Sequence, residues 1–546
     1  MEWYVVVRQA RTQSKRAQTP MIDEIIEGAT IYDGDSARPF ATDLAIVGDR
    51  IALIGDLRER DARRRTDGRG RTLAPGFIDV HSHSDEIWLA DGRCVGKIRQ
   101  GVTTEIGGNC GTSVAPLRGI ARDRKIEEAR VVGVDASWRD LDDFFASVER
   151  AGVALNIATL VGLGTTRRSV AGDDDTRLDE TTLAAQLALV REGIDHGALG
   201  ISSGLIYVPS RYADLDELVA CAITAREAGM ARYVSHIRNE SDDMLAALDE
   251  AICVGERAET AVHISHHKAS GKKNWGDVHR SLAAIARARG RGVAVSADVY
   301  PYTAMWTGLD TLLPDDALAG GRDATLERLA DPETVVALAL RLELDHAGTW
   351  HDIAISSVSS LRNERYAGMR VDEIAARMRC SPARAVLRLL FEERLGVEAI
   401  FFSMSELDVA TVMSAEFVSI GSDASARAID GPTAVGVPHP RTFGCFPRVF
   451  GRFVRGRKTL ELGEAIRRMT SLPAQQFGLA DRGTIARDAF ADLVLFDANT
   501  IVDTATYDQP YAYPTGIDAV WVNGRAVVRD SEITGARPGR ALRGGR

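Results

Sequence analysis

Short apolar runs that alternate with helical segments constrain the fold of this chain most strongly. The runs lie at residues 77–83, 102–110, 155–163, 198–205, 232–236, 262–267, 293–300 and 417–423. Helical periodicity appears between several of them, for example at 215–228 and 243–257. Eight strands with intervening helices predict an α/β fold, a TIM-like (β/α)₈ barrel, whose functional site lies where the strands end.

Both ends of the chain carry a different, β-rich pattern. Residues 22–75 contain β-prone segments separated by turn signals such as Asp33-Gly34. The pattern returns at 491–497 and 519–528, where Asn523-Gly524 predicts a hairpin turn. We therefore expect residues 22–75 and 484–530 to form one small β domain beside a barrel over 76–483. The long gap between the last two strands, about residues 305–400, predicts an inserted subdomain.

The two termini fall outside these patterns. Residues 1–21 are interpreted as a disordered leader or an upstream start, with the functional chain beginning near Met21. The segment 531–546 is a basic tail, and we interpret its arginine-rich end as a solvated terminus.

A length of 546 residues exceeds what one hydrophobic core usually supports, so two or more structural units are expected.

Composition narrows the classes of possible binding partner and cellular compartment. The formal net charge of -10 argues against nucleic acid or an anionic membrane as a partner and favours a small-molecule substrate. No apolar run approaches the roughly 20 residues of a membrane span. Six cysteines without paired spacing favour a reducing cytoplasm over a disulfide framework.

Polar residues follow the predicted strands where each one ends. His81 and His83 close the first strand, and residues two apart on an extended chain point to the same side. That geometry suits two nitrogen ligands on one metal ion. Further donors close other strands: Cys110, His236, His266 and Asp423. A thiolate together with imidazoles favours zinc over magnesium or calcium.

Three other histidines have predicted structural roles. His263 and His267 lie on the opposite face of their strand from His266, so they do not share its direction. His196 precedes Gly197 at an apparent helix end, which indicates a cap or a solvent-facing residue.

Seven motifs, taken together, resemble those of the N-acyl-D-amino-acid deacylases (D-aminoacylases), a family of the amidohydrolase superfamily. The motifs are His81-Ser-His-Ser-Asp85, Gly107-Gly-Asn-Cys-Gly111, Ser235-His-Ile-Arg-Asn-Glu240, Ser265-His-His-Lys268, Tyr300-Pro-Tyr302, Gly421-Ser-Asp423 and His439-Pro-Arg441. The resemblance covers about residues 22–530. It implies an imperfect (β/α)₈ barrel beside a small β-sandwich domain made from both chain ends.

The resemblance also implies a set of metal ligands. The tightly held zinc would be bound by Cys110, His236 and His266. A second, weaker site would use His81, His83 and Asp423, with Cys110 able to bridge. Many superfamily members bridge two metals with a carboxylated lysine after the fourth strand, but residues 198–204 contain no lysine.

The implied reaction is zinc-dependent hydrolysis of an N-acyl-D-amino acid to a carboxylate and a free D-amino acid. Asp423 would act as general base and then general acid for a water activated by the metal. The family's substrate-orienting residues correspond to Tyr207, Lys268 and Arg441. Arg441 is suited to bind the α-carboxylate of the substrate in a bidentate manner.

Two departures from the family pattern bear on the substrate. The family usually has Gly-His-Gly after the third strand, whereas this chain has Gly162-Leu163-Gly164. Met305 and Trp306 stand where the family tends to have small residues, so a bulky apolar wall is expected there.

Two alternative functions follow from the same residues. One is amide hydrolysis of another kind in the same superfamily, on a cyclic amide or imide, as in dihydroorotase and hydantoinase, or on a β-linked dipeptide. The other is a non-catalytic barrel that serves as a binding scaffold.

Overall fold

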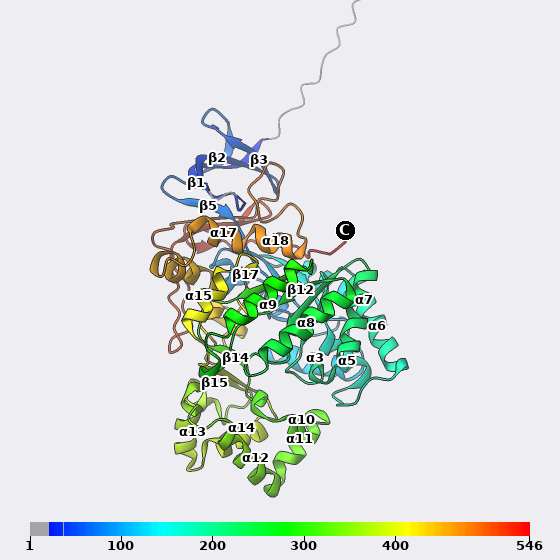
Figure 1. Cartoon of the computed structure of the whole chain (residues 1–546). Helices are drawn as coiled ribbons and strands as arrows, with labels where there is room; N and C mark the ends of the chain where they lie inside the picture. The colour runs from blue at the N-terminus through cyan, green and yellow to red at the C-terminus, as the bar shows by residue number, and fades with distance from the viewer. Residues whose placement is uncertain (1–20, 36–37, 546) are drawn as a thin grey trace, which may run out of the picture.

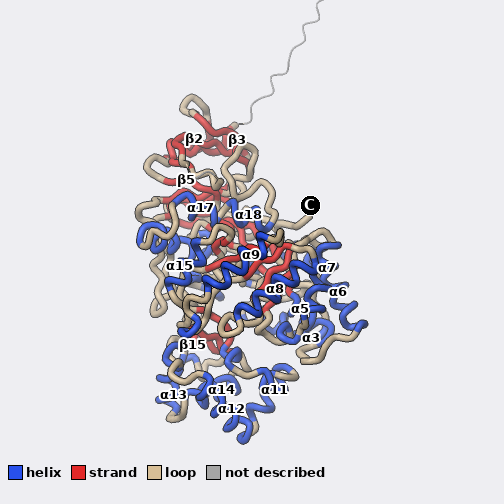
Figure 2. The backbone as a smooth tube through the Cα atoms, viewed as in Figure 1, coloured by secondary structure: helices blue, strands red, loops and turns tan. Residues whose placement is uncertain are grey.

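The computed structural model describes residues 21–35 and 38–545, which form a barrel, a β domain and an inserted unit (Figures 1 and 2). The interpretation of residues 1–21 as a leader lies, apart from Met21, outside the described residues. Among the described helices, none is long and apolar enough to cross a membrane.

The barrel is built from two parallel sheets. One has the order β6-β7-β8 and the other β17-β13-β12-β11-β10-β9. Their strands are β6 (Phe77–Asp79), β7 (Val102–Gly107), β8 (Asn156–Thr159), β9 (Val161–Gly162), β10 (Ile201–Gly204), β11 (Arg232–His236), β12 (Ala261–Ile264), β13 (Val295–Val299) and β17 (Val418–Ile420). Only Leu160 separates β8 from β9, and a parallel bridge between Ser82 and Ala424 joins the first strand to the last. The predicted (β/α)₈ barrel is confirmed.

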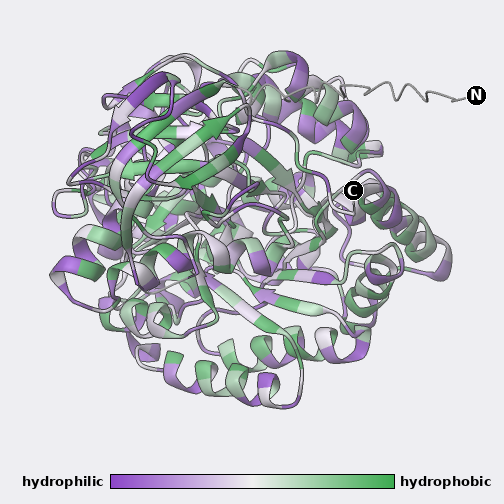
Figure 3. Cartoon of the chain, turned by 90° about the horizontal axis from the view of Figure 1, so that it is seen from above, coloured by the Kyte–Doolittle hydropathy of each residue, from purple (hydrophilic) through white to green (hydrophobic). Residues whose placement is uncertain are grey.

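Amphipathic helices cover the barrel, as α4 illustrates. Its buried residues Leu141, Phe144, Phe145 and Val148 follow the spacing of one helix face, and the Asp140 side chain caps its first turn. In Figure 3 the helices accordingly change between polar and apolar colours along their length. The helices of the barrel region are α1 (Ile87–Ala90), α2 (Val95–Ile98), α3 (Gly119–Val131), α4 (Leu141–Ala151), α5 (Leu163–Ala171), α6 (Glu180–Asp195), α7 (Leu215–Glu227), α8 (Met244–Ala258), α9 (Val278–Gly290), α15 (Glu406–Ser414), α16 (Arg441–Arg448), α17 (Leu462–Met469) and α18 (Ser471–Phe477).

A buried ionic network ties the strands together beneath the site. The Lys97 ammonium lies 2.6 Å from Asp79 and 2.8 Å from Glu105, and all three side chains are inaccessible to solvent. It also donates to Ser422 Oγ at 2.8 Å. Buried charges are tolerated when they are paired and hydrogen-bonded in this way. The network therefore links the ends of β6, β7 and β17, which carry part of the candidate site.

Both chain ends contribute to a nine-stranded sheet. Its main path is β21-β20-β19-β18-β5-β1-β2-β3, and β4 pairs with β1. The strands are β1 (Ile22–Ile31), β2 (Phe40–Val47), β3 (Arg50–Gly55), β4 (Ala62–Asp67), β5 (Thr72–Pro75), β18 (Leu493–Phe496), β19 (Ile517–Val522), β20 (Arg525–Arg529) and β21 (Glu532–Ile533).

This sheet curls over onto itself. Trp521 of β19 donates to the Glu24 carboxylate of β1 at 3.0 Å, although two strands, β18 and β5, separate β19 from β1. Three strand spacings in a flat sheet amount to about 14 Å, too far for that contact. The sheet is therefore bent, and Ile26, Leu44 and Trp521 share one apolar core.

Between β13 and β17 the chain builds a separate unit with its own apolar core (Figure 1). It contains an antiparallel sheet in the order β14-β16-β15 and, among the described residues, five α-helices. These elements are β14 (Met305–Gly308), α10 (Asp315–Leu318), α11 (Gly321–Ala330), α12 (Pro332–Asp345), β15 (Ile353–Val358), α13 (Val371–Met378), α14 (Pro382–Glu392) and β16 (Val397–Phe401). Residues of β14 and β16 line the large cavity at the end of the barrel.

The interpretation of the basic tail as a solvated terminus is wrong for the residues described. Ile157 of β8 donates to the carbonyl of Arg540 at 2.9 Å and accepts from the N–H of Leu542 at 2.7 Å. Gly544 donates to Gly197 O at 2.9 Å. The tail docks because it supplies hydrogen-bond partners to backbone groups of β8 that would otherwise be buried without them.

Candidate active site

Six potential metal donors lie where barrel strands end. His81 and His83 follow β6, Cys110 follows β7, His236 ends β11, His266 follows β12, and Asp423 follows β17. Three of them have positive φ values: 52° at Cys110, 35° at His266 and 51° at Asp423. Such a conformation costs a non-glycine residue about 1–3 kcal/mol, and it is retained where the surrounding structure enforces it, often at functional sites. At these three positions the chain turns sharply out of its strand.

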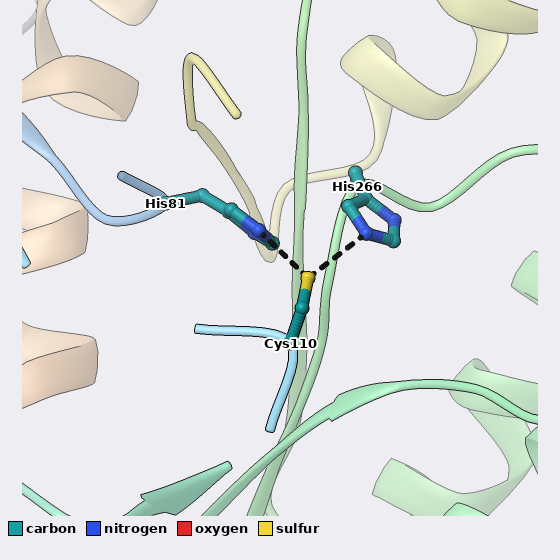
Figure 4. A group of neighbouring side chains, drawn as sticks. All are labelled: His81, Cys110 and His266. Atoms are coloured by element: carbon teal, nitrogen blue, oxygen red, sulfur yellow. Dashed lines mark hydrogen bonds between the residues drawn. The ribbon is translucent and has the colours of Figure 1, made fainter. Parts of the chain in front are cut away.

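The donors form one continuous cluster. Cys110 Sγ lies 3.3 Å from His81 Nε2 and 3.5 Å from His266 Nε2 (Figure 4). Sulfur and nitrogen ligands of one tetrahedral zinc ion are about 3.6 Å apart, given bond lengths of about 2.3 and 2.0–2.1 Å. Ligand atoms also lie within 4.8 Å of one another in two further groups: His81, His83 and Asp423, and His236, Glu240 and His266.

His236 provides an independent test of fit to a metal. Both of its ring nitrogens are buried and have no hydrogen-bond partner in the described part of the chain. Buried polar atoms are rarely left unpaired, so such an imidazole requires an explanation. Burial lowers the pKa of His236, which favours the neutral form that binds metals. The residues therefore fit a zinc ion.

The Cys110 thiol is held as an anion. Burial acts to raise its pKa, but His81 and His266 outweigh that effect and hold the pKa well below the usual range of a thiol. A buried thiolate among imidazoles is a typical zinc donor.

Two carboxylates that the sequence interpretation overlooked orient these rings. Asp298 lies 3.2 Å from His81 Nδ1 and accepts the backbone N–H of His266 at 2.9 Å. Glu240 lies 2.9 Å from His266 Nδ1. Carboxylates in this position fix the tautomer and direction of a metal-binding histidine. The available signals were the spacing of Glu240, four residues after His236, and the position of Asp298 within a predicted strand.

The remaining strand histidines have structural partners, as predicted. His263 lies 3.0 Å from Asp298 and 2.8 Å from Ser296 Oγ. His267 Nε2 lies 2.7 Å from Ser281 Oγ. Neither belongs to the donor groups found in the described residues.

Asp423 sits between the imidazoles and a guanidinium. Its carboxylate lies 3.0 Å from His83 Nε2 and 2.9 Å from Arg441 Nη1. Burial acts to raise the pKa of Asp423, but Arg441 and the neighbouring histidines outweigh it and hold the pKa well below its usual range. The carboxylate is therefore ionised at neutral pH and able to accept a proton.

The predicted substrate residues line one cavity of about 1080 Å³. Tyr207 Oη lies 2.9 Å from Thr307 Oγ1, and the Lys268 ammonium lies 2.6 Å from Glu240. Arg441 is buried, with its guanidinium carbon 4.6 Å from the centre of the Tyr300 ring. Every predicted site residue except His81 lines this cavity, and His81 contacts Cys110. Met305 and Trp306 form part of its wall.

Comparison with known proteins gives consistent matches over nearly the whole chain. Residues 66–528 match the model of the amidohydrolase family. The chain is 36% identical to an N-acyl-D-glutamate deacylase and 34% identical to a D-aminoacylase, both of Alcaligenes xylosoxydans xylosoxydans. These matches cover 96% of this chain and 96% of the first relative, and 95% of this chain and 97% of the second. The crystal structure of N-acyl-D-glutamate deacylase from Bordetella bronchiseptica, complexed with zinc and a phosphonate that mimics the tetrahedral intermediate, superposes with a TM-score of 0.82. That match has 34% identity and covers 96% of this chain and 100% of the other.

Proposed function

This chain belongs to the amidohydrolase family and, within it, to the N-acyl-D-amino-acid deacylases, and from this premise we propose its function. It is a zinc-dependent hydrolase that cleaves the amide bond of N-acyl-D-amino acids to a carboxylate and a free D-amino acid. The observation that carries the proposal is the convergence of Cys110, the strand-end imidazoles and Asp423 on the cavity that Arg441 lines.

We assign the more tightly held zinc to Cys110, His236 and His266, and a second, weaker ion to His81, His83 and Asp423. The ring nitrogens of His236, which have no hydrogen-bond partner among the described residues, and the low pKa of the Cys110 thiol support this assignment. When bound, zinc supplies a positive charge beside the scissile carbonyl oxygen and a water molecule that ionises near neutral pH.

The protein's own residues position the substrate and move the proton. In hydrolysis the water oxygen adds to the carbonyl carbon, the C–N bond breaks, and the leaving nitrogen takes up a proton. Asp423 accepts the proton of the attacking water and delivers it to that nitrogen. Arg441 binds the α-carboxylate, and Lys268 and Tyr207, which line the same cavity, contact the substrate.

Substituting Arg441→Ala tests the carboxylate contact. We expect kcat/KM on N-acetyl-D-amino acids to fall about 10- to 100-fold or more, because hydrogen bonds to charged groups contribute about 1.5–3 kcal/mol each. An analogue whose α-carboxylate is amidated should lose much less. Steady-state kinetics on the two substrates measures the difference, and equal losses on both would argue against the contact.

The proposed activity is tested directly by a hydrolysis screen. Zinc-loaded protein should release free amino acid from N-acyl-D-amino acids and much less from the L enantiomers. A chelator should abolish the activity and added zinc should restore it. Ring opening of a hydantoin or dihydroorotate, without hydrolysis of any N-acyl-D-amino acid, would replace the proposal with the cyclic-amide alternative.

The proposal also covers the cellular compartment of the enzyme and its binding partner. We place the enzyme in the cytoplasm, and the six cysteines, none of which forms a disulfide in the described chain, are consistent with a reducing compartment. Its partner is a small-molecule substrate, and the net charge of -10 gives no support for nucleic acid.

A further inference from the structure

Three carboxylates of the inserted unit line the active-site cavity, Asp345, Asp352 and Glu398, and Glu398 is the one carried by the β14–β16 pair. In the antiparallel pair of β14 and β16, Glu398 lies directly opposite Gly308, and Trp306 opposite Ile400. Val397, Ala399 and Phe401 belong to the apolar core of the unit. Because successive side chains of a strand alternate between its faces, Glu398 points away from that core. It is exposed to the cavity that it lines.

Glu398 has no cationic partner in the described structure, where no ion pair or hydrogen bond involves its side chain. Gly308, opposite it, has no side chain to cover it. A methyl group at Gly308 would lie 2.3 Å from Asp310 Oδ1, so the Asp310 carboxylate occupies the space beside Gly308. Burial raises the pKa of Asp310 to about 6. Asp310 thus adds a second negative charge near Glu398, while Arg427, His83 and Arg441 act on Glu398 electrostatically without forming an ion pair with it among the described residues.

Arg427 also lines the cavity and acts on Glu398 electrostatically, but it forms no ion pair with Glu398 in the described part of the chain. It donates to Ser425 Oγ at 3.2 Å and to Val435 O at 3.1 Å, and it lies 5.2 Å from the centre of the Trp306 ring. Other cations of the cavity have carboxylate partners. These pairs are Arg441–Asp423, Lys268–Glu240, Lys272–Asp352 and Lys273–Asp242.

The position of Arg441 indicates which part of the substrate meets this wall. Arg441 donates to the carbonyl of Trp306 at 3.4 Å, so the proposed α-carboxylate site lies beside β14. The α-carboxylate and the amino-acid side chain are attached to the same carbon, whereas the acyl group lies across the scissile bond. From that position the side chain can reach the wall of β14 and β16, where Glu398 faces the cavity.

Building on the proposed function, we propose that Glu398 is a specificity-determining residue that selects N-acyl-D-amino acids with a cationic side chain, such as the amine of D-lysine or the guanidinium of D-arginine. A carboxylate without an ion-pair or hydrogen-bond partner gains a charge-assisted hydrogen bond from such a group. It repels an acidic side chain at the same place.

Kinetics of zinc-loaded protein on N-acetyl derivatives of D-lysine, D-arginine, D-methionine and D-glutamate test this assignment. We expect the basic substrates to be preferred, and Glu398→Gln to lower kcat/KM for them about 10- to 100-fold while D-methionine changes little. Glu398→Lys should shift the preference towards D-glutamate. Asp345→Asn, which removes an exposed acid elsewhere on the cavity lining, is the matched control and should leave the preference unchanged.

Two results would overturn the inference alone. One is an unchanged ratio of D-lysine to D-methionine activity in Glu398→Gln. The other is a wild-type preference for D-glutamate, which would assign selection to Arg427 instead. Failure of zinc-loaded protein to hydrolyse any of the four substrates would overturn the proposed function and this inference together. Normal D-methionine hydrolysis in Glu398→Gln shows that the variant is folded.

Discussion

Replacing Asp423 by Asn is expected to lower kcat by about 10²–10⁴-fold, because that is the usual contribution of general acid–base catalysis. An amide cannot accept the proton of the attacking water, whereas the ionised carboxylate can. Asn has nearly the same shape as Asp. The substitution therefore removes the negative charge beside His83 and Arg441 and leaves the side chain in nearly the same position. Steady-state turnover, measured beside zinc content, checks the expectation.

A matched control lies in the same segment of the chain. Asp430 is an exposed carboxylate that pairs with Arg93 at 2.9 Å. Asp430→Asn should retain full turnover and full zinc. If Asp423→Asn kept near-normal turnover, another group would have to carry the proton. If it lost tightly bound zinc as well as activity, the residue would act chiefly as a ligand.

Replacing Cys110 by Ala is expected to yield folded protein without tightly bound zinc. Cys110 supplies the thiolate of the proposed tight site, and its sulfur contacts two of the candidate imidazoles. Losing an outer-shell partner costs about 10–100-fold in metal affinity, and losing a ligand should cost more. Elemental analysis after dialysis against a weak chelator measures the zinc that remains.

Cys94 provides the control for this substitution. It is also a fully buried cysteine, but it belongs to none of the candidate donor groups of the described residues. Cys94→Ala should therefore retain the zinc of the wild-type protein. Full zinc occupancy in Cys110→Ala would refute the proposed ligand set. It would indicate that the site around His81, His83 and Asp423 holds the zinc instead.

The barrel and the main donors could be predicted because both depend on local periodicity. Apolar runs of strand length between helical segments predict a (β/α)₈ barrel, and the carboxyl ends of its parallel strands meet at one rim. The two-residue spacing of His81 and His83 places both on one side of the chain whatever surrounds them. The same alternation predicts that the side chains of His263 and His267 point to the opposite face from that of His266.

The orienting and selecting carboxylates could not be predicted in this way. Asp298 is 217 residues from His81 in the sequence, and only barrel closure brings the two together. Glu398 faces the substrate cavity because the inserted unit turns the opposite face of β16 towards its own core. The composition of the basic tail likewise predicts a solvated segment. The tail instead forms hydrogen bonds with backbone groups of β8, which composition does not reveal.

The sequence by itself determined the fold class, the family and the chemical kind of each metal donor. These follow from residue types and from spacings of a few residues, because backbone geometry sets the direction in which side chains at a given spacing point. Only the tertiary structure decided which donors touch, which carboxylates hold them, and which cavity carboxylate forms no ion pair with another described residue. Those contacts join segments up to hundreds of residues apart, and their energies depend on burial and pairing that exist only once the barrel has closed.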